Sequence, residues 1–260
     1  MVNEQKVVSI RPDKVPQFSA KDVAYMNQMD KLRPFWEHDM DLESFKEAIT
    51  KKQTHVVDRN LLHDVLSKQY IKLGFDFAPK TELRDSNTFT ITTAHQPSLL
   101  TGPLYFIYKA VSAIVLSRQL KETYPDYNFQ PVFVIGGEDH DFEEINHLKL
   151  FGKTLEWDNK GQNGSCGRMN LDGMDQVLDD LYAILGDGEH ATSLKSMLDA
   201  AFKESKWTYG DAMQHFVINL FKETELLVMN MDDAQLKQAF IPIVSKELTE
   251  SFSQSSVQNR

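Results

Sequence analysis

Hydrophobic positions recur at helical spacing in the first part of the chain and then change to strand-like runs. Ser19 and Asp22 are spaced as in a capping box, and apolar side chains return every three or four residues over 42–52 and 58–72. Such spacing is typical of helices that bury one face. It predicts a helical N-terminal region over residues 1–75.

The segment 76–150 carries the pattern of a strand–helix–strand unit. Residues 87–93 are β-branched and aromatic, and 131–135 form a continuous apolar run typical of a strand buried on both faces. Between them, Pro103 is a favoured first residue of a helix. The apolar stripe that we expect to face the sheet consists of Leu104, Ile107, Tyr108, Val111, Ile114 and Val115. A right-handed parallel connection is the default for such a unit.

Three further segments complete the predicted organisation. Residues 151–205 are predicted to be an insertion, glycine-rich and polar over 152–173 and outside the core, followed by two short helices. A helix and an apolar strand over 206–232 return to the core, and 233–260 begin a C-terminal helical segment. The alternation of strands and helices favours an α/β fold with a parallel sheet, a helical N-terminal region and an inserted segment of loops and helices.

Composition narrows the class of protein. The 260 residues are 41% hydrophobic and 25% charged, and the net charge is −10, which argues against duplex nucleic acid or an anionic membrane as partner. The single cysteine excludes a disulfide framework and fits a reducing compartment. No apolar run has the length of a signal peptide or a membrane span. We therefore expect a cytoplasmic protein.

Ligands of open parallel sheets bind at the carboxyl ends of the strands, and three predicted strand ends carry polar residues. The loop after the first strand holds His95, Gln96, Thr101 and Gly102 ahead of a helix whose N-terminus would attract an anion. The third strand end reads Asn230-Met-Asp-Asp233. Neither GxGxxG nor GxxxxGK[ST] occurs, so the usual dinucleotide and P-loop sites are absent.

The second strand end is the densest polar cluster of the chain. Residues 138–147 contain five carboxylates, two imidazoles and one amide directly after Gly136-Gly137. The catalytic candidates in this cluster are Glu138, Asp139, His140 and Asp141. His140 is a candidate general base, with Asp139 or Asp141 to orient its imidazole. A merely solvated loop would have a similar composition.

A metal site is a further alternative for the same cluster. His140 and His147 are separated by six residues, which is not the helical i, i+4 pair, and no HExxH or CxxC motif occurs. We expect no bound metal. A metal-dependent hydrolase using Glu138–His147 and a non-catalytic module that binds an anion or a partner remain as alternatives.

Two strings resemble one known family. TTAHQPSLLTGPLYFIYKA (92–110) and PVFVIGGEDHDFEEINHL (131–148) are similar to the bacillithiol biosynthesis cysteine-adding enzymes, the BshC family, and the stretch over 208–237 is similar more weakly. The resemblance implies a Rossmann-like core, and in complete members a C-terminal coiled coil that makes a homodimer. Family members are longer, so this chain corresponds to their N-terminal portion.

The resemblance also implies an activity. The family adds cysteine to glucosaminyl-malate in the last step of bacillithiol biosynthesis, so both small molecules become expected substrates. Carried over by position, the substrate-binding residues are His95, Gln96, Thr101, Gly102, Asn146 and His147. Joining a carboxylate to an amine requires an activated acyl group, from ATP or from an acylated carrier, and the sequence identifies neither. The HxGH signature of nucleotidylyl transferases is absent.

Overall fold

The computed structural model describes residues 8–77, 79, 81–204 and 206–258, and its contacts form two compact units that meet between Val56 and Val57. The helices of the first unit are α1 (Ala20–Met26), α2 (Phe45–Gln53) and two 3-10 helices, Pro12–Lys14 and Asp30–Phe35. The capping box is present: Asp22 N donates to Ser19 Oγ at 3.2 Å and Ser19 N to Asp22 Oδ2 at 2.7 Å. This reciprocal pair satisfies two backbone donors at the start of α1.

The second unit begins with α3 (Arg59–Lys72), earlier than the predicted boundary near residue 75. Leu66 and Tyr70 of this helix are buried in the main hydrophobic core. The Tyr70 hydroxyl also accepts a hydrogen bond from the backbone N–H of Val228 at 3.0 Å. Because α3 contributes core side chains, it belongs to the sheet-containing unit although its sequence pattern matches the preceding helices.

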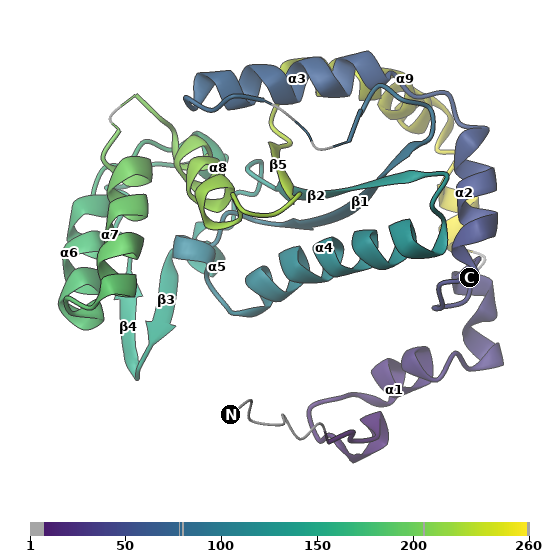
Figure 1. The fold of residues 1–260 in the computed structure, drawn as a ribbon, viewed down its shortest axis with the longest axis horizontal. Coiled ribbons are helices and arrows are strands. Elements are labelled where there is room, and N and C mark those ends of the chain that lie inside the picture. Colours follow the sequence, from purple (N-terminus) through teal and green to yellow (C-terminus); the bar gives the residue numbers. More distant parts are fainter. Residues whose placement is uncertain (1–7, 78, 80, 205, 259–260) are drawn as a thin grey trace. The chain divides into compact units, whose positions relative to one another are not determined.

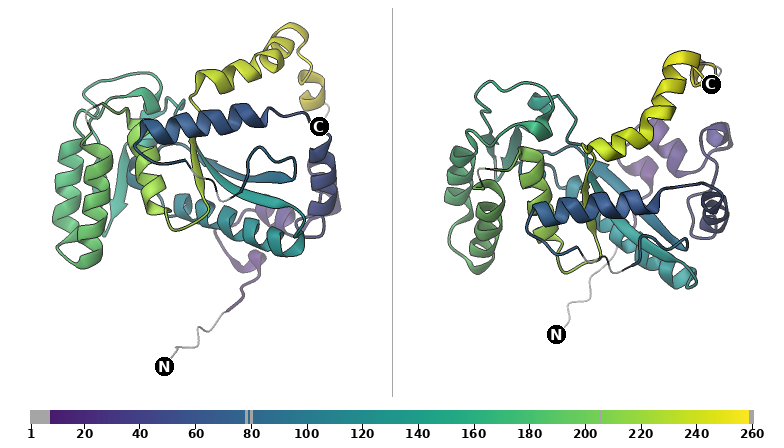
Figure 2. Two further views of the ribbon diagram at one scale, coloured as in Figure 1. Left: turned by 45° about the horizontal axis from the view of Figure 1, so that its top comes forward. Right: turned by 90° about the horizontal axis from the view of Figure 1, so that it is seen from above.

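A parallel three-stranded sheet is the centre of the second unit (Figure 1). Its strands are β1 (Thr88–His95), β2 (Asn128–Ile135) and β5 (Leu227–Asn230), in the order β1-β2-β5. Helix α4 (Tyr105–Thr123) connects β1 to β2. Figures 1 and 2 show α3 and α4 on opposite faces of this sheet. The α/β prediction is confirmed.

The predicted inward stripe of α4 is right only in part: Ile114 is 4% exposed and Ile107 packs against the core, but most of the stripe is exposed. Phe106 and Ala110 are fully buried on the sheet side, whereas Tyr108 is 63% and Val111 40% exposed. Apolar residues surround nearly the whole helix, so spacing alone does not select a face. The small Ala110 and Ala113 allow the helix to approach the strands closely. The helix also begins at Tyr105 rather than Pro103, because Leu99–Thr101 form a separate 3-10 turn.

The predicted exclusion of 152–173 from the core is also wrong. Strands β3 (His147–Leu150) and β4 (Lys153–Glu156) form an antiparallel hairpin. Trp157, directly after it, is 1% exposed and stacks on Tyr209 with ring centroids 4.6 Å apart. Cys166 and Met169 are buried too. The polar, glycine-rich composition conceals a few large apolar side chains that reach the common core.

Helices complete the unit on either side of β5. The hairpin follows a short α5 (Phe142–Ile145) and is followed by α6 (Met174–Leu185), α7 (Glu189–Phe202) and α8 (Tyr209–Leu220). After β5, α9 (Ala234–Glu250) and α10 (Gln254–Gln258) end the described chain. Thr208 and Asp211 form the capping box of α8. None of the helices among the described residues has an apolar stretch of the length that a bilayer requires.

The orientation of α4 predicts that two neighbouring substitutions destabilise the protein to very different extents. Ala110→Asp buries an unpaired carboxylate in the hydrophobic core and should lower the free energy of unfolding by roughly 3 kcal/mol or more. Val111→Asp, on the exposed side, should change it by less than about 1 kcal/mol. Urea denaturation followed by circular dichroism measures both. A larger loss for Val111→Asp would restore the stripe expected from the sequence.

Candidate functional site

The register of the sheet brings three loops to one edge. Ile135, the last residue of β2, pairs with His95 of β1 on one side and Asn230 of β5 on the other. All three strands therefore end at the same level. The polar segments that follow them surround two pockets at the carboxyl edge, where ligands of open parallel sheets bind.

One pocket lies between the loop after β1 and the β3–β4 hairpin and has a volume of about 840 Å³. We call it the His95 pocket. Among its lining residues are His95, Gln96, Ser98, Thr101, Gly102, Tyr105, Glu144, His147 and Lys149. Five of the six residues predicted to bind substrate therefore meet there. The sixth, Asn146, lies beside it: its Oδ1 is 3.1 Å from Nδ1 of His147.

His95 is held in place from two sides. Its Nδ1 lies 2.9 Å from the carbonyl oxygen of Gln96, and its ring packs on Tyr105 and Phe106 with centroids 5.1 and 5.5 Å apart. Burial lowers the pKa of His95, the hydrogen bond to Gln96 opposes that shift, and the charge of Lys109 adds to it. The ring is therefore neutral at pH 7. With Nδ1 donating to the carbonyl, Nε2 is left as an acceptor.

The floor of the His95 pocket is a strained turn. Leu100 and Thr101 have φ of +50° and +73°, a region that costs non-glycine residues about 1–2 kcal/mol each. Gly102 follows with φ of +48°, and a Cβ there would lie 2.6 Å from Cβ of Ser98. The N–H groups of Thr101 and Gly102 donate to Ser98 and Leu99. They are therefore not free to bind an anion in the way the sequence suggested.

The four predicted catalytic residues do not form one group. Asp139 Oδ1 accepts from the N–H of Asp141 at 2.9 Å, and Asp141 Oδ1 caps α5 through the N–H of Glu144 at 3.3 Å. Both carboxylates hold the backbone rather than the imidazole of His140. That imidazole is exposed and makes no hydrogen bond with the described residues. Glu138 instead pairs with Lys237, with Oε1 and Nζ 2.6 Å apart.

A metal site is not favoured by these positions. In the part of the chain that the structure describes, no three His, Cys, Asp or Glu side chains come together as a metal would require. Cys166 is buried beneath the second loop, and its N–H donates to the carbonyl of Asp139 at 2.7 Å. Burial first, then the charges of Asp139 and Asp141, raise the pKa of Cys166 to about 11. Its thiol is protonated at pH 7, which does not suit a nucleophile.

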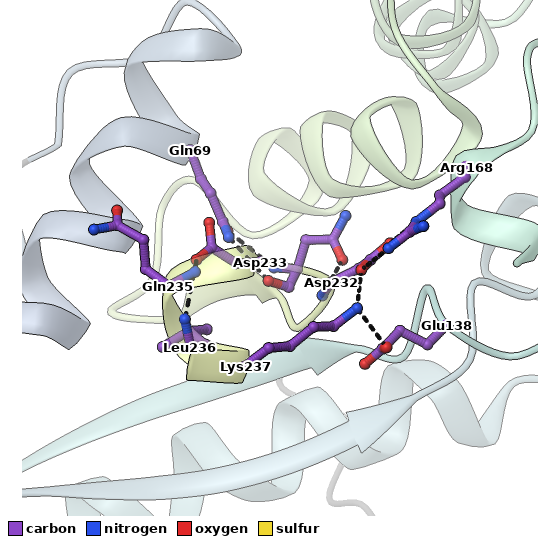
Figure 3. A network of polar contacts seen from close by, with 9 residues as sticks. Gln69, Glu138, Arg168, Asp232, Asp233, Gln235, Leu236 and Lys237 are labelled. Atoms are coloured by element: carbon purple, nitrogen blue, oxygen red, sulfur yellow. Dashed lines mark hydrogen bonds and ion pairs between the residues drawn. The ribbon is translucent and has the colours of Figure 1, made fainter. Parts of the chain in front are cut away.

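A second pocket, of about 340 Å³, lies at the ends of β2 and β5. We call it the charged pocket. Its lining residues are Lys72, Gly167, Arg168, Thr208, Asp211, Asn230, Asp232, Ala234 and Lys237. The carboxylate of Asp232 accepts hydrogen bonds from Nε and Nη2 of Arg168 at 2.5 and 2.7 Å (Figure 3). It accepts a third from Nζ of Lys237 at 2.5 Å. The bond to Arg168, aided by Lys237, lowers the pKa of Asp232 to about 2 although burial opposes the shift.

Close glycine packing places Arg168 at this edge. The N–H of Gly167 donates to the carbonyl of Gly137 at 2.8 Å. A Cβ at Gly167 would lie 2.7 Å from Cα of Gly137, and one at Gly210 would lie 2.9 Å from the carbonyl oxygen of Gly167. Only glycine permits this approach of three backbone segments. It brings the loop before Arg168 onto the ends of β2 and α8.

The charged pocket contains the residues that the sequence reading missed. Asp232 lies in the third strand end that the sequence indicated, but its partner Arg168 is 64 residues away. Asp211 belongs to the capping box of α8, and Nζ of Lys72 lies 2.6 Å from its Oδ1. No local pattern marks these pairings, because each joins segments that only the fold brings together.

The comparisons with known proteins agree with this architecture. Residues 10–260 match the family described as Bacillithiol biosynthesis BshC, N-terminal Rossmann-like domain. The chain belongs to the BshC family. Its Rossmann-like sheet is thereby confirmed.

Two curated relatives named "Putative cysteine ligase BshC" extend the match. The Flavobacterium johnsoniae protein is 38% identical over 239 residues, covering 90% of this chain and 45% of its own length. The Christiangramia forsetii protein is 37% identical over 235 residues, covering 87% of this chain and 43% of its own length. This BshC chain thus spans less than half the length of these relatives.

The Asp232 pairs predict a pH-dependent contribution to stability. Because the folded pKa lies near 2 and the ordinary value is 3.8, the contribution is complete above about pH 4 and is lost as the pH falls toward 2. Asp232→Asn should lower the free energy of unfolding by roughly 1–3 kcal/mol at pH 7. Asp179→Asn, on the exposed side of α6, is the matched control and should have little effect. Urea titrations at pH 7, 4 and 2.5 measure the free energy of unfolding of each protein. A difference between Asp232→Asn and the native protein that does not change with pH would contradict this assignment.

Proposed function

We propose that this BshC chain supplies the substrate-binding edge of a cysteine ligase, which joins cysteine to glucosaminyl-malate in bacillithiol biosynthesis. One observation carries the proposal. Five residues that the family resemblance marked as substrate-binding, from two separate segments, line a single pocket at the carboxyl edge of the sheet. The names of the relatives support the ligase class. Both expected substrates are small molecules, and a biosynthetic step of this kind fits the cytoplasm.

The His95 pocket suits a polar sugar derivative. Nε2 of Gln96 donates to Oε2 of Glu144 at 3.0 Å, so an amide and a carboxylate lie side by side as partners for hydroxyl groups. The neutral His95 adds an acceptor, and Tyr105 offers an aromatic surface. Lys149 is a cation for a malate carboxylate. We therefore propose that glucosaminyl-malate binds in this pocket.

The chemical step requires a group that accepts a proton. When the amine nitrogen attacks the activated cysteinyl carbonyl, the new C–N bond forms, the activating group leaves with its electron pair, and the nitrogen loses a proton. We propose that His140 accepts this proton, since its ring is exposed at the same edge and is not held by a neighbouring carboxylate. The activating group comes from outside these residues. We also propose that the complete protein forms a homodimer, as the resemblance implies for complete family members.

Binding of glucosaminyl-malate gives the first test. Removal of the imidazole in His95→Ala should weaken it about tenfold, the effect of one lost hydrogen bond and its packing. His190→Ala, an exposed histidine on α7, is the matched control and should bind like the native protein. Isothermal titration calorimetry measures both affinities. Equal affinity for the two variants would exclude the His95 pocket as the binding place.

His140 has a separate test in catalysis. His140→Ala, in a protein that forms bacillithiol from its substrates, should keep the native melting temperature because the side chain is exposed. It should lower turnover at least a hundredfold, a usual contribution of general acid–base catalysis, while leaving the affinity for glucosaminyl-malate unchanged. Thiol formation measured with a chromogenic reagent gives the turnover. Near-normal turnover would remove His140 from the mechanism.

A further inference from the structure

Charges of both signs are arranged by depth in the charged pocket. The carboxylates of Asp211 and Asp232 are the buried members, each with a side chain only 9% exposed. The cations lie at the rim, with side chains of Lys72, Arg168 and Lys237 that are 57%, 63% and 40% exposed. The floor is therefore negative and the rim positive.

Several donors of this pocket are not used within the protein. Arg168 binds Asp232 through Nε and Nη2, and its Nη1 makes no hydrogen bond with the described residues. The Nδ2 amide of Asn230 likewise donates to no described residue, although its Oδ1 accepts from the N–H of Asp232 at 3.0 Å. Lys72 directs its described hydrogen bonds to the two oxygens of Asp211. Such unused donors are available to a ligand's oxygen atoms.

The arrangement discriminates between classes of ligand. A phosphate or another simple anion entering the pocket would meet the two carboxylates of the floor. A simple cation would have to pass three cationic side chains. A zwitterion satisfies both layers, because its ammonium group pairs with carboxylates while its carboxylate pairs with Arg168 and Lys72. The volume of about 340 Å³ fits a small ligand of this kind.

We propose that the charged pocket binds the free α-amino acid substrate, with the ammonium group on Asp211 and Asp232 and the carboxylate on Arg168 and Lys72. This inference rests on the proposed function, which makes that amino acid cysteine. Glu138, three residues after the end of β2, pairs with Lys237 at the rim of the charged pocket, and Glu144 of the same segment lines the His95 pocket. Cysteine and glucosaminyl-malate then lie in separate pockets along one edge of the sheet.

Calorimetry with L-cysteine under reducing conditions tests the inference on the whole chain. Arg168→Gln should weaken L-cysteine binding about tenfold or more, the loss expected for a charge-assisted pair. Arg118→Gln is the matched control, since Arg118 pairs with Glu225 through the same two nitrogens and is 55% exposed outside the pocket. It should bind as the native protein does. Lys72→Gln, on the opposite rim, should also weaken binding.

Truncated ligands separate the two halves of the pocket. Cysteamine, which lacks the carboxylate, should bind more weakly than L-cysteine, and Arg168→Gln should not weaken its binding. 3-Mercaptopropionate lacks the ammonium group and should also bind more weakly than L-cysteine. Unchanged L-cysteine affinity in Arg168→Gln, or tighter binding of inorganic phosphate than of L-cysteine, would overturn the inference.

The two binding measurements test the proposed function and the amino-acid pocket separately. If His95→Ala weakens glucosaminyl-malate binding but Arg168→Gln leaves L-cysteine binding unchanged, only the amino-acid pocket is refuted. L-cysteine binding that depends on Arg168, without any glucosaminyl-malate binding, supports the pocket and refutes the proposed pair of substrates.

Discussion

The pairing of Ile135 with both His95 and Asn230 is the constraint on which the rest of the site depends. Parallel strands in register must end at one level, so the three following loops start from a common line. A shift of one residue in either ladder would turn every side chain of that strand to the opposite face. The register of the sheet thus places residues that are distant in sequence beside one another.

Backbone geometry then fixes what that edge presents. The strained turn at Leu100 and Thr101 shapes the His95 pocket, and the contact of Gly167 with Gly137 shapes the charged pocket. The loop after β2 serves both, because Glu144 bonds to Gln96 in one pocket and Glu138 to Lys237 at the other. Strained backbone costs stability, and it occurs here where the edge of the sheet is open to ligands.

Sequence reasoning succeeded where the signal was local. The capping box of Ser19, the apolar run ending at Ile135 and the loop at His95 could all be predicted from neighbouring residues. The face of α4 was not, because its apolar residues surround the helix and only packing on the sheet selects Ala110 over Val111. The pair of Arg168 and Asp232 was not either, since no periodic pattern links two residues that only the tertiary fold joins.

We propose that the carboxyl edge of the sheet binds the two substrates in separate pockets. Backbone amide NMR of the isotopically labelled chain, titrated with glucosaminyl-malate and then with L-cysteine, tests it most directly. Glucosaminyl-malate should shift the amides of 95–102 and 144–150, whereas L-cysteine should shift those around Arg168 and Asp232. Shifts confined to other surfaces, or one set of amides responding to both ligands, would contradict it.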